Sequence, residues 1–245
     1  MGHLIDEGDI AAEQAKMDEG EWRRAYATQF HDRNRIEDLG PISIDDWRRL
    51  EDPSSQAEGR LVYGVAVSVD RQRASIGVAA DSSSGGLHVE LIDSRPGTLW
   101  VAQTLMAIIR RNGGAGIAID PSSPAGSLVA EIETVLRELP EGERPELFKM
   151  STRDHAAAAG ALVDRVSPPD GTAPVLRRPP GQPDLDDAVE AARKRAMGDG
   201  AWGFARLRSE TDISPLEAVT MALGGFLCLA EEEVQTEPFI AWVDV

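Results

Sequence analysis

This sequence has little cysteine. Cys228 is the only one among 245 residues, which excludes an intrachain disulfide and a zinc site built on several thiolates. It lies in the apolar run GGFLCLA, a setting that favours a buried, inert thiol over a catalytic one. A chain of this length buries enough apolar surface to fold without disulfides. We therefore expect a protein of a reducing compartment, the cytoplasm.

Long hydrophobic segments are also missing. No run reaches the roughly 20 apolar residues that span a bilayer. The first residues, MGHLIDEGDI, lack the basic and apolar regions of a secretory signal. The sequence therefore predicts a soluble protein with no membrane partner.

Positive charge is in deficit, with 25 Lys and Arg against 42 Asp and Glu and a formal net charge of −17. This balance excludes a protein that coats nucleic acid by bulk electrostatic attraction, because phosphate binding depends on clustered Lys and Arg. Local basic positions still allow a DNA-contacting strip, and its candidates are Arg177, Arg178, Arg193 and Lys194. A solvated surface of mixed charge is the alternative.

Residues 1–57 differ from the rest of the chain. Trp22, Tyr26 and Phe30 recur at four-residue spacing, which predicts a helix with one apolar stripe that docks on a neighbour. A second helix is predicted in SIDDWRRLED, and the turn-forming segment DPSSQAEG ends it. We interpret residues 1–57 as a helical extension or linker and residues 58–245 as the main domain.

The main domain begins with three predicted strands. GRLVYGVAVSVD alternates bulky and small residues, which is typical of a central strand with one crowded face. The short connections DRQR and SSSGG lead into ASIGVAA and LHVELID, so the three strands are expected to be antiparallel neighbours. TLWVAQTLMAIIRR then reads as a helix. A right-handed helical crossover places the fourth strand, GIAID, parallel to and beside the first.

The later elements alternate between helices and strands. Helices are predicted from Pro124 through SLVAEIETVLREL, in STRDHAAAAGALVD behind a capping pair of Ser151 and Asp154, in DLDDAVEAARKRAMG and in DISPLEAVTMALGGFLCLA. Strands are predicted in PELFKM and AWGFARLR, and the proline-rich SPPDGTAPVLRRPPGQPD is interpreted as a long exposed loop, with a β-ribbon as the alternative. The order predicts an α/β fold with a mixed sheet, three antiparallel strands followed by parallel ones, flanked by helices.

Several catalytic motifs are absent from the sequence. No GxxxxGK[ST] phosphate loop occurs, which excludes an ATP-driven motor within this chain. The histidines, His88 and His155 among them, show no spacing that suggests a triad, and Ser68, Ser122 and Ser123 have no base nearby, so a serine hydrolase is disfavoured. An actin-like ATPase shares the opening strand order, but DRQR is a poor phosphate cradle.

Asp120 is the first candidate functional residue. Burying an aspartate at the end of an apolar strand costs free energy unless a hydrogen-bond partner or a metal ion compensates its charge. The predicted element order is that of ribonuclease H-like nucleases. Moreover, LVYGVAVSVDRQRASIGVAA, HVELIDSRPGTLWV, IAIDPSSPAGSL, FKMSTRDHAAAAGALVDRV, DLDDAVEAARKR and TDISPLEAVTMAL together resemble the C-terminal nuclease domain of tailed-bacteriophage large terminase subunits. The resemblance covers roughly residues 60–230, and GTLWV and DISPL carry it jointly.

The resemblance implies a metal-dependent endonuclease that cuts concatemeric viral DNA during genome packaging, in the cytoplasm of an infected or lysogenic host cell. It implies two Mg²⁺ or Mn²⁺ ions held by an acidic cluster, which activate a water molecule and stabilise the leaving oxygen. Such hard cations require carboxylate oxygens. The implied partners are double-stranded DNA, the phage portal and the small terminase subunit.

Two acids match the family's metal ligands. Asp120 matches the acid that ends the fourth strand, and Asp212 matches the acid near the start of the last helix. Each also has a structural interpretation, since Asp120 can cap the turn that follows it and Asp212 can cap a helix. Asp186 and Asp187 are reserve candidates, with solvated acids in a helix's first turn as their alternative.

The first strand departs from the family pattern. Family members read GVDVS where this chain reads GVAVS, so Ala66 occupies the place of the expected first metal ligand. Asp70 lies on the same strand face but about 13 Å further along an extended strand, and it can substitute only if the strand ends early or turns back. Two interpretations stay open. Either Ala66 leaves a nuclease-dead module that docks on DNA or the portal, or Asp70 supplies the missing ligand.

Overall fold

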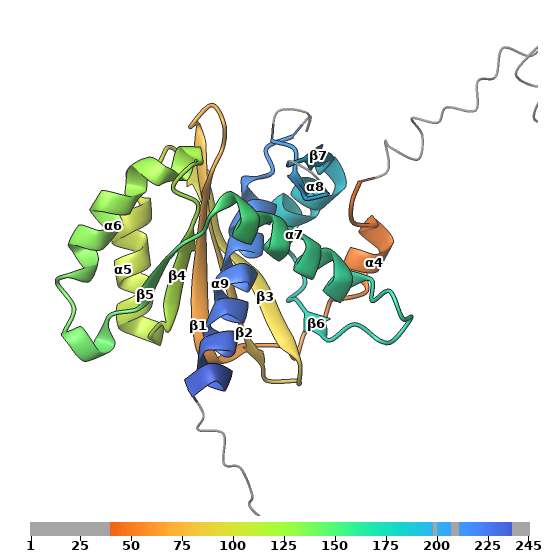
Figure 1. Ribbon diagram of the computed structural model, residues 1–245, viewed down its shortest axis with the longest axis horizontal. Helices are drawn as coiled ribbons and strands as arrows, with labels where there is room; N and C mark the ends of the chain where they lie inside the picture. The colour runs from red at the N-terminus through yellow and green to blue at the C-terminus, as the bar shows by residue number, and fades with distance from the viewer. Residues whose placement is uncertain (1–39, 198–199, 207–210, 237–245) are drawn as a thin grey trace, which may run out of the picture. The chain divides into compact units, whose positions relative to one another are not determined.

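The computed structural model describes residues 40–197, 200–206 and 211–236, with side chains up to residue 230 (Figure 1). Its centre is a six-stranded sheet with the order β5-β4-β1-β2-β3-β6. The strands are β1 (Ala57–Val67), β2 (Arg73–Ser82), β3 (Leu87–Pro96), β4 (Gly116–Ile119), β5 (Glu146–Lys149) and β6 (Leu176–Arg177). The first three are antiparallel, and β4 and β5 run parallel to β1. The predicted mixed sheet and the parallel pairing of the fourth strand with the first are confirmed.

Helices cover both faces of the sheet (Figure 1). They are α4 (Ile44–Arg48), α5 (Val101–Asn112), α6 (Val129–Leu136), α7 (Thr152–Val166), α8 (Pro183–Ala191) and α9 (Ser214–Thr236). Two short 3₁₀ turns, η1 (Pro124–Leu128) and η2 (Glu141–Glu143), flank α6. One apolar core lies between the sheet and α5 and α6, and a second joins the sheet to α4, α7, α8 and α9. None of the helices in these ranges is both long and apolar enough to cross a bilayer.

Helix α9 lies directly on β1 and β2 because the strands present glycine to it. A Cβ atom at Gly64 would lie 2.0 Å from the carbonyl oxygen of Ala218, and one at Gly77 would lie 2.7 Å from the backbone nitrogen of Val219. The small face of the first strand, visible in the sequence, is therefore the face that receives α9. This close approach brings the first turn of α9 to the ends of the central strands.

The register of β1 and β4 decides what lies at that end. Their last paired residues are Val65 and Ile119, so Ala66 and Asp120 come next on the two neighbouring strands. Val65 and Ile119 belong to the core under α5 and α6. Since side chains alternate along a strand, Ala66 and Asp120 face the opposite side, toward α9.

Two elements near the C-terminus differ from the sequence prediction. Helix α8 ends at Ala191, where the backbone of Ala192 becomes extended, instead of running through the basic residues that follow. Those residues form β7 (Lys194–Ala196), which pairs with β8 (Trp202–Phe204) in a separate two-stranded sheet. The predicted strand AWGFARLR thus lies outside the main sheet. Backbone pairing across the hairpin takes the place of helical hydrogen bonds in this segment, and the Lys194 ammonium lies 4.7 Å from the centre of the Trp202 ring.

The segment before β1 is part of this unit. Trp47 and Leu50, on and just after α4, are buried in the α9-side core together with residues of α7, α8 and α9. The second helix expected in the extension is therefore a component of the main domain. The first expected helix, with Trp22, Tyr26 and Phe30, lies outside the described residues.

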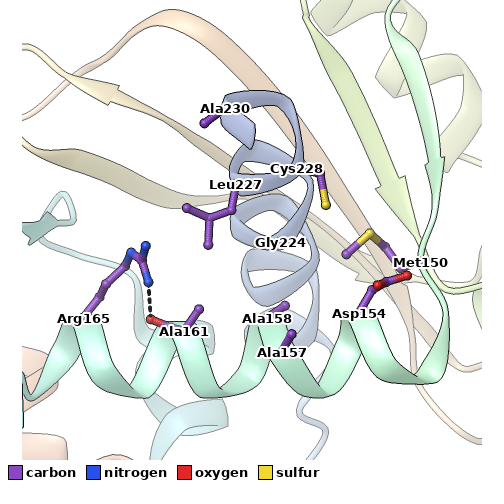
Figure 2. A pocket seen from close by; sticks show the side chains of 10 residues that line it. All are labelled: Met150, Asp154, Ala157, Ala158, Ala161, Arg165, Gly224, Leu227, Cys228 and Ala230. Atoms are coloured by element: carbon purple, nitrogen blue, oxygen red, sulfur yellow. Dashed lines mark hydrogen bonds between the residues drawn. The ribbon is translucent and has the colours of Figure 1, made fainter. Parts of the chain in front are cut away.

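A groove of about 710 Å³ runs between α7 and the later half of α9 (Figure 2). The helices approach closely here, since a Cβ atom at Gly224 would lie 2.8 Å from that of Ala158. The groove is mostly apolar. Its two charged side chains are already bonded, Asp154 to the cap of α7 and Arg165 to the carbonyl of Ala161. Cys228 lines this groove and is half-buried, so it is less enclosed than its apolar run predicts.

Candidate functional site

The carboxylate of Asp120 is held at the end of β4 by groups from several elements. Its Oδ1 accepts hydrogen bonds from the backbone nitrogen of Ser122 at 2.8 Å and from the Ser122 hydroxyl at 2.5 Å. Its Oδ2 lies 3.4 Å from Nδ1 of His155, on α7, and 3.7 Å from Nη2 of Arg206, just after β8. Asp120 thus has both a turn-capping role and charged neighbours.

The segment after Asp120 folds into a tight loop because its residues are small and bond locally. The Ser123 hydroxyl donates to the carbonyl of Asp120 at 2.7 Å and accepts from the backbone nitrogen of Ala125 at 3.2 Å, which starts η1. A Cβ atom at Gly126 would lie 2.1 Å from the carbonyl oxygen of Pro121. The sequence PSSPAG therefore forms a compact turn that fixes the direction of the Asp120 side chain.

A second buried acid, Glu217, lies in the first turn of α9. The Nε of Arg206 donates to both of its carboxylate oxygens, at 2.5 and 2.7 Å. Burial raises the pKa of Glu217, and the neighbouring Arg206 guanidinium opposes that rise. The Nε2 of His155 lies 4.0 Å from Glu217 Oε1 and has no hydrogen-bond partner among the described residues. Asp120, His155, Arg206 and Glu217 form one cluster, which we call the Asp120 pocket.

The acidity of Asp120 reflects these partners. Burial alone would raise its pKa, but hydrogen bonds from His155 and Ser122 and the charge of Arg206 outweigh burial and hold the pKa of Asp120 well below its usual range. Asp120 is therefore a stable carboxylate, as a metal ligand or an ion-pair partner must be.

Three residues of this pocket were not predicted from the sequence to be site residues. Glu217 had one usable signal, because it is a single acid inside the apolar run SPLEAVTMALGGF. A lone charge on a helix that is otherwise apolar has to be paired where the helix is buried. His155 and Arg206 carried a weaker signal, since each lies where a polar and an apolar stretch of the sequence meet and neither is a lone charge inside an apolar run.

Asp70, the substitute ligand considered for the first strand, lies in the turn between β1 and β2. It is exposed, and its Oδ1 accepts from the Ser68 hydroxyl at 2.6 Å and from the backbone nitrogen of Gln72 at 3.0 Å. These bonds lower the pKa of Asp70. Its carboxylate stabilises the hairpin turn, and the buried side chain next to Asp120 on β1 is that of Ala66.

Asp212 lies just before α9, as predicted, and acts as a cap there. Its Oδ1 accepts from the backbone nitrogen of Ser214 at 3.0 Å, and its Oδ2 accepts from the Ser214 hydroxyl at 2.7 Å. The Ser214 hydroxyl also lies 2.9 Å from that of Ser75 on β2. Asp212 therefore ties the start of α9 to the sheet, and Glu217 is the acid that α9 turns into the Asp120 pocket.

The two reserve acids on α8 lie apart from the Asp120 pocket. Asp186 accepts a hydrogen bond from Nε1 of Trp47 at 2.9 Å and ion-pairs with Arg178 at 3.1 Å. Asp187 is exposed on the outer surface of the helix. Asp186 thus has a structural partner, and Asp187 is a solvated acid.

The candidate DNA contacts separate into accessible and inaccessible residues. Arg178 is fully buried, so its guanidinium cannot reach a phosphate, and this candidate does not fit. Arg177 and Arg193 are half-buried and donate to nearby backbone carbonyls. Lys194 is exposed on β7 and remains a predicted contact.

The Asp120 pocket does not fit a two-metal centre as it stands. Two ions roughly 3.5 to 4 Å apart need several carboxylate oxygens, whereas here the pocket offers two acids that are already paired with Arg206 and His155. Across residues 40–197, 200–206 and 211–236, no cluster of three or more His, Cys, Asp or Glu side chains is arranged to hold a metal ion.

Comparison with solved structures identifies the fold. The HK97 bacteriophage large terminase has a TM-score of 0.59 at 13% identity, over 92% of this chain and 52% of that chain. The chain has the fold of a phage large terminase nuclease domain. A K428A mutant nuclease domain of the large terminase subunit gp2 of bacterial virus Sf6 with manganese gives 0.54 at 13% identity, over 76% of this chain and 99% of that domain. The large terminase nuclease of thermophilic phage G20c with bound magnesium gives 0.51 at 12% identity, over 76% and 96%.

This likeness confirms the predicted ribonuclease H-like arrangement of a terminase nuclease domain. No protein-family model and no curated protein matches the sequence. The chain spans about half the length of the HK97 large terminase that it matches.

Proposed function

We propose that this chain is a nuclease-type domain of a phage large terminase, acts in viral DNA packaging inside the host cell, and does not cut DNA efficiently with Ala66 in place. The fold supports the terminase assignment, because the neighbours that share it include nuclease domains with manganese or magnesium. The observation that carries the proposal about activity is the position of Ala66, next to Asp120 across the parallel β1–β4 pair.

The chemistry follows from the number of carboxylates. Phosphodiester hydrolysis by divalent cations depends on a cluster of acids that fixes the ions, and a methyl group at residue 66 contributes no oxygen. The fold tolerates the alanine, because removing one of several neighbouring carboxylates relieves like-charge repulsion. The retained role is then binding, to double-stranded DNA and to the portal and small terminase subunit. Lys194 on the β7–β8 hairpin is the exposed member of the four candidate DNA contacts, and we assign it to DNA contact.

An active Mg²⁺- or Mn²⁺-dependent endonuclease is the second candidate. It is favoured by the strongly ionised carboxylate of Asp120 and by Glu217, which enters the pocket from the helix where the resemblance places a further acid. In this alternative Asp120 and Glu217 hold the cation together with an acid from outside the pocket, such as Asp70 or Asp212.

A plasmid-cleavage assay separates the two. Supercoiled DNA is incubated with Mn²⁺ and the unmodified chain, Ala66→Asp, Ala66→Asn, or Ala66→Asp combined with Asp120→Asn. Loss of even an outer-shell partner of a metal commonly costs about 10- to 100-fold in activity. We therefore expect Ala66→Asp to cut at least about tenfold faster than the unmodified chain. Ala66→Asn adds similar volume without charge and stays at background, as does the double variant.

Other outcomes contradict the proposal. Cutting by the unmodified chain that Asp120→Asn abolishes would establish an active endonuclease. A folded Ala66→Asp variant that does not cut would show that the pocket is not a nuclease site lacking one ligand.

A further inference from the structure

Arg206 is positioned between the two buried acids of the Asp120 pocket. Its Nε contacts both oxygens of Glu217, and its Nη2 faces Oδ2 of Asp120 at 3.7 Å. The side chains of Asp120 and Glu217 are 8% and 2% exposed, whereas that of Arg206 is 18% exposed. The cation therefore approaches two enclosed anions from the more open side.

The hairpin that precedes Arg206 fixes this approach. The backbone nitrogen of Ala205 donates to the carbonyl of Arg193 at 2.7 Å, which extends the β7–β8 pairing to the residue before Arg206. Ala205 is itself buried. The guanidinium is thus aimed at the pocket by backbone pairing on one side and held there by Glu217 on the other.

Charge balance explains why a cation is required. Two carboxylates enclosed together repel each other, and a buried carboxylate without a counter-charge is costly. A divalent metal ion relieves this repulsion, and so does a guanidinium that bonds to both acids. With Ala66 in place the pocket contains two carboxylates and one guanidinium. The guanidinium offsets one of the two negative charges and occupies the position from which a divalent ion would contact both acids, so it weakens the attraction for such an ion.

We infer that Arg206 takes the place of a metal ion between Asp120 and Glu217, so that the charge of the two acids is partly offset by the protein and the pocket binds divalent cations weakly. The inference rests on the proposed function, because it concerns the same site, and it assigns to Arg206 the control of metal occupancy. It also explains why the residues present do not fit a two-metal centre, since Asp120 and Glu217 already interact with Arg206.

The test is to measure Mn²⁺ binding to the full chain. Binding is measured by isothermal titration calorimetry and by the shift of the melting temperature. We compare the unmodified chain with Arg206→Gln, Arg206→Lys, and Arg206→Gln combined with Asp120→Asn. Glutamine retains hydrogen-bond donors and removes the charge. Removing a unit charge at contact distance from both acids should tighten Mn²⁺ binding at least about tenfold. Lysine keeps the charge and should leave binding weak, and the double variant should lose the gain.

Each alternative outcome is informative. If Arg206→Gln binds Mn²⁺ no more tightly than the unmodified chain, or if Asp120→Asn does not remove the gain, the inference is wrong. If Arg206→Gln is unfolded without metal, the inference requires that millimolar Mn²⁺ restore folding while Na⁺ at equal ionic strength does not. Failure of this rescue overturns the inference. None of these measurements depends on DNA cleavage. The inference about Arg206 can therefore be wrong while the proposed packaging role is correct, and the packaging role can be wrong while the inference about Arg206 is correct.

Discussion

Two buried charge clusters in this domain each contain one arginine and two acids, but they are arranged in opposite ways. At Arg178 the arginine is buried completely, and its partners Glu51 and Asp186 are 39% and 23% exposed. In the Asp120 pocket the acids are enclosed and the arginine lies nearer the surface. The first arrangement joins segments that are distant in sequence, while the second encloses two anions that a cation must neutralise. A similar set of ion pairs thus buries the cation in one cluster and the two anions in the other.

The Arg178 cluster shows what a structural connection looks like in detail. Its guanidinium lies 5.2 Å from the centre of the Trp47 ring and donates from Nε to the carbonyl of Trp47. The backbone nitrogen of Arg178 donates to the carbonyl of Leu50 at 3.0 Å, and its own carbonyl accepts from Asp52 at 2.9 Å. The segment around α4 is therefore fixed to the loop that contains β6, and stability is the property that this cluster controls.

Breaking the Arg178 cluster should have the largest effect on stability. Arg178→Ala removes the buried partner of Glu51 and Asp186 and opens a cavity beside Trp47. Loss of one member of a fully buried ion pair typically costs about 3–5 kcal/mol. Because Glu51 and Asp186 are partly exposed, we expect the free energy of unfolding in urea to fall by about 3 kcal/mol, the lower end of that range. Arg177→Ala, at the neighbouring half-buried position, is the control and should change it by less than about 1 kcal/mol. Equal effects at the two positions would contradict the structural assignment of Arg178.

Acid should lower the free energy of unfolding, and part of this loss should require the carboxylate of Asp120. The folded-state pKa of Asp120 lies below its usual value, so the stability that it contributes is present above about pH 4 and is lost as the pH falls below it. Asp120→Asn should cost about 1.5–3 kcal/mol at pH 7, the usual range for hydrogen bonds to charged groups. The difference between the two proteins should shrink toward pH 2 in urea unfolding measured across pH.

The matched control for this pH dependence is Asp52. Its pKa is lowered to about 2, chiefly by the hydroxyls of Ser54 and Ser84, but it is solvent-accessible. Asp52→Asn should therefore give a smaller pH-dependent difference than Asp120→Asn. A constant difference between the Asp120→Asn variant and the unmodified chain from pH 7 to pH 2 would mean that Asp120 is not an ionised member of the pocket.

The sheet was predictable from the sequence because its connections are short. The short turns DRQR and SSSGG make consecutive strands antiparallel neighbours, and a helix of the length of α5 returns the chain to a parallel position beside β1. The end of α8 was harder to predict, since ARKRAM is compatible with a helix by local preference. Pairing with Trp202–Phe204 across the hairpin decides the outcome there.

The Asp120 pocket was only half predictable for a related reason. Asp120 was predictable because a charge at the end of an apolar strand needs a compensating partner. Ala66 was recognisable because the family pattern has an aspartate at that position. Glu217 and Arg206 reach the pocket only through the packing of α9 on Gly64 and the pairing of β7 with β8. Arg178 was misjudged because a proline-rich segment suggests exposure, while its partner Trp47 is 131 residues away in sequence.

In the Asp120 pocket we infer that Arg206 stands in place of a metal ion between Asp120 and Glu217. The most direct measurement is the melting temperature of Ala66→Asp and of the unmodified chain as Mn²⁺ is increased. A third carboxylate beside Asp120 adds a negative charge that Arg206 does not offset, so Mn²⁺ should raise the melting temperature of Ala66→Asp with a saturable dependence and leave the unmodified chain unchanged. Equal responses of the two proteins to Mn²⁺ would contradict the account.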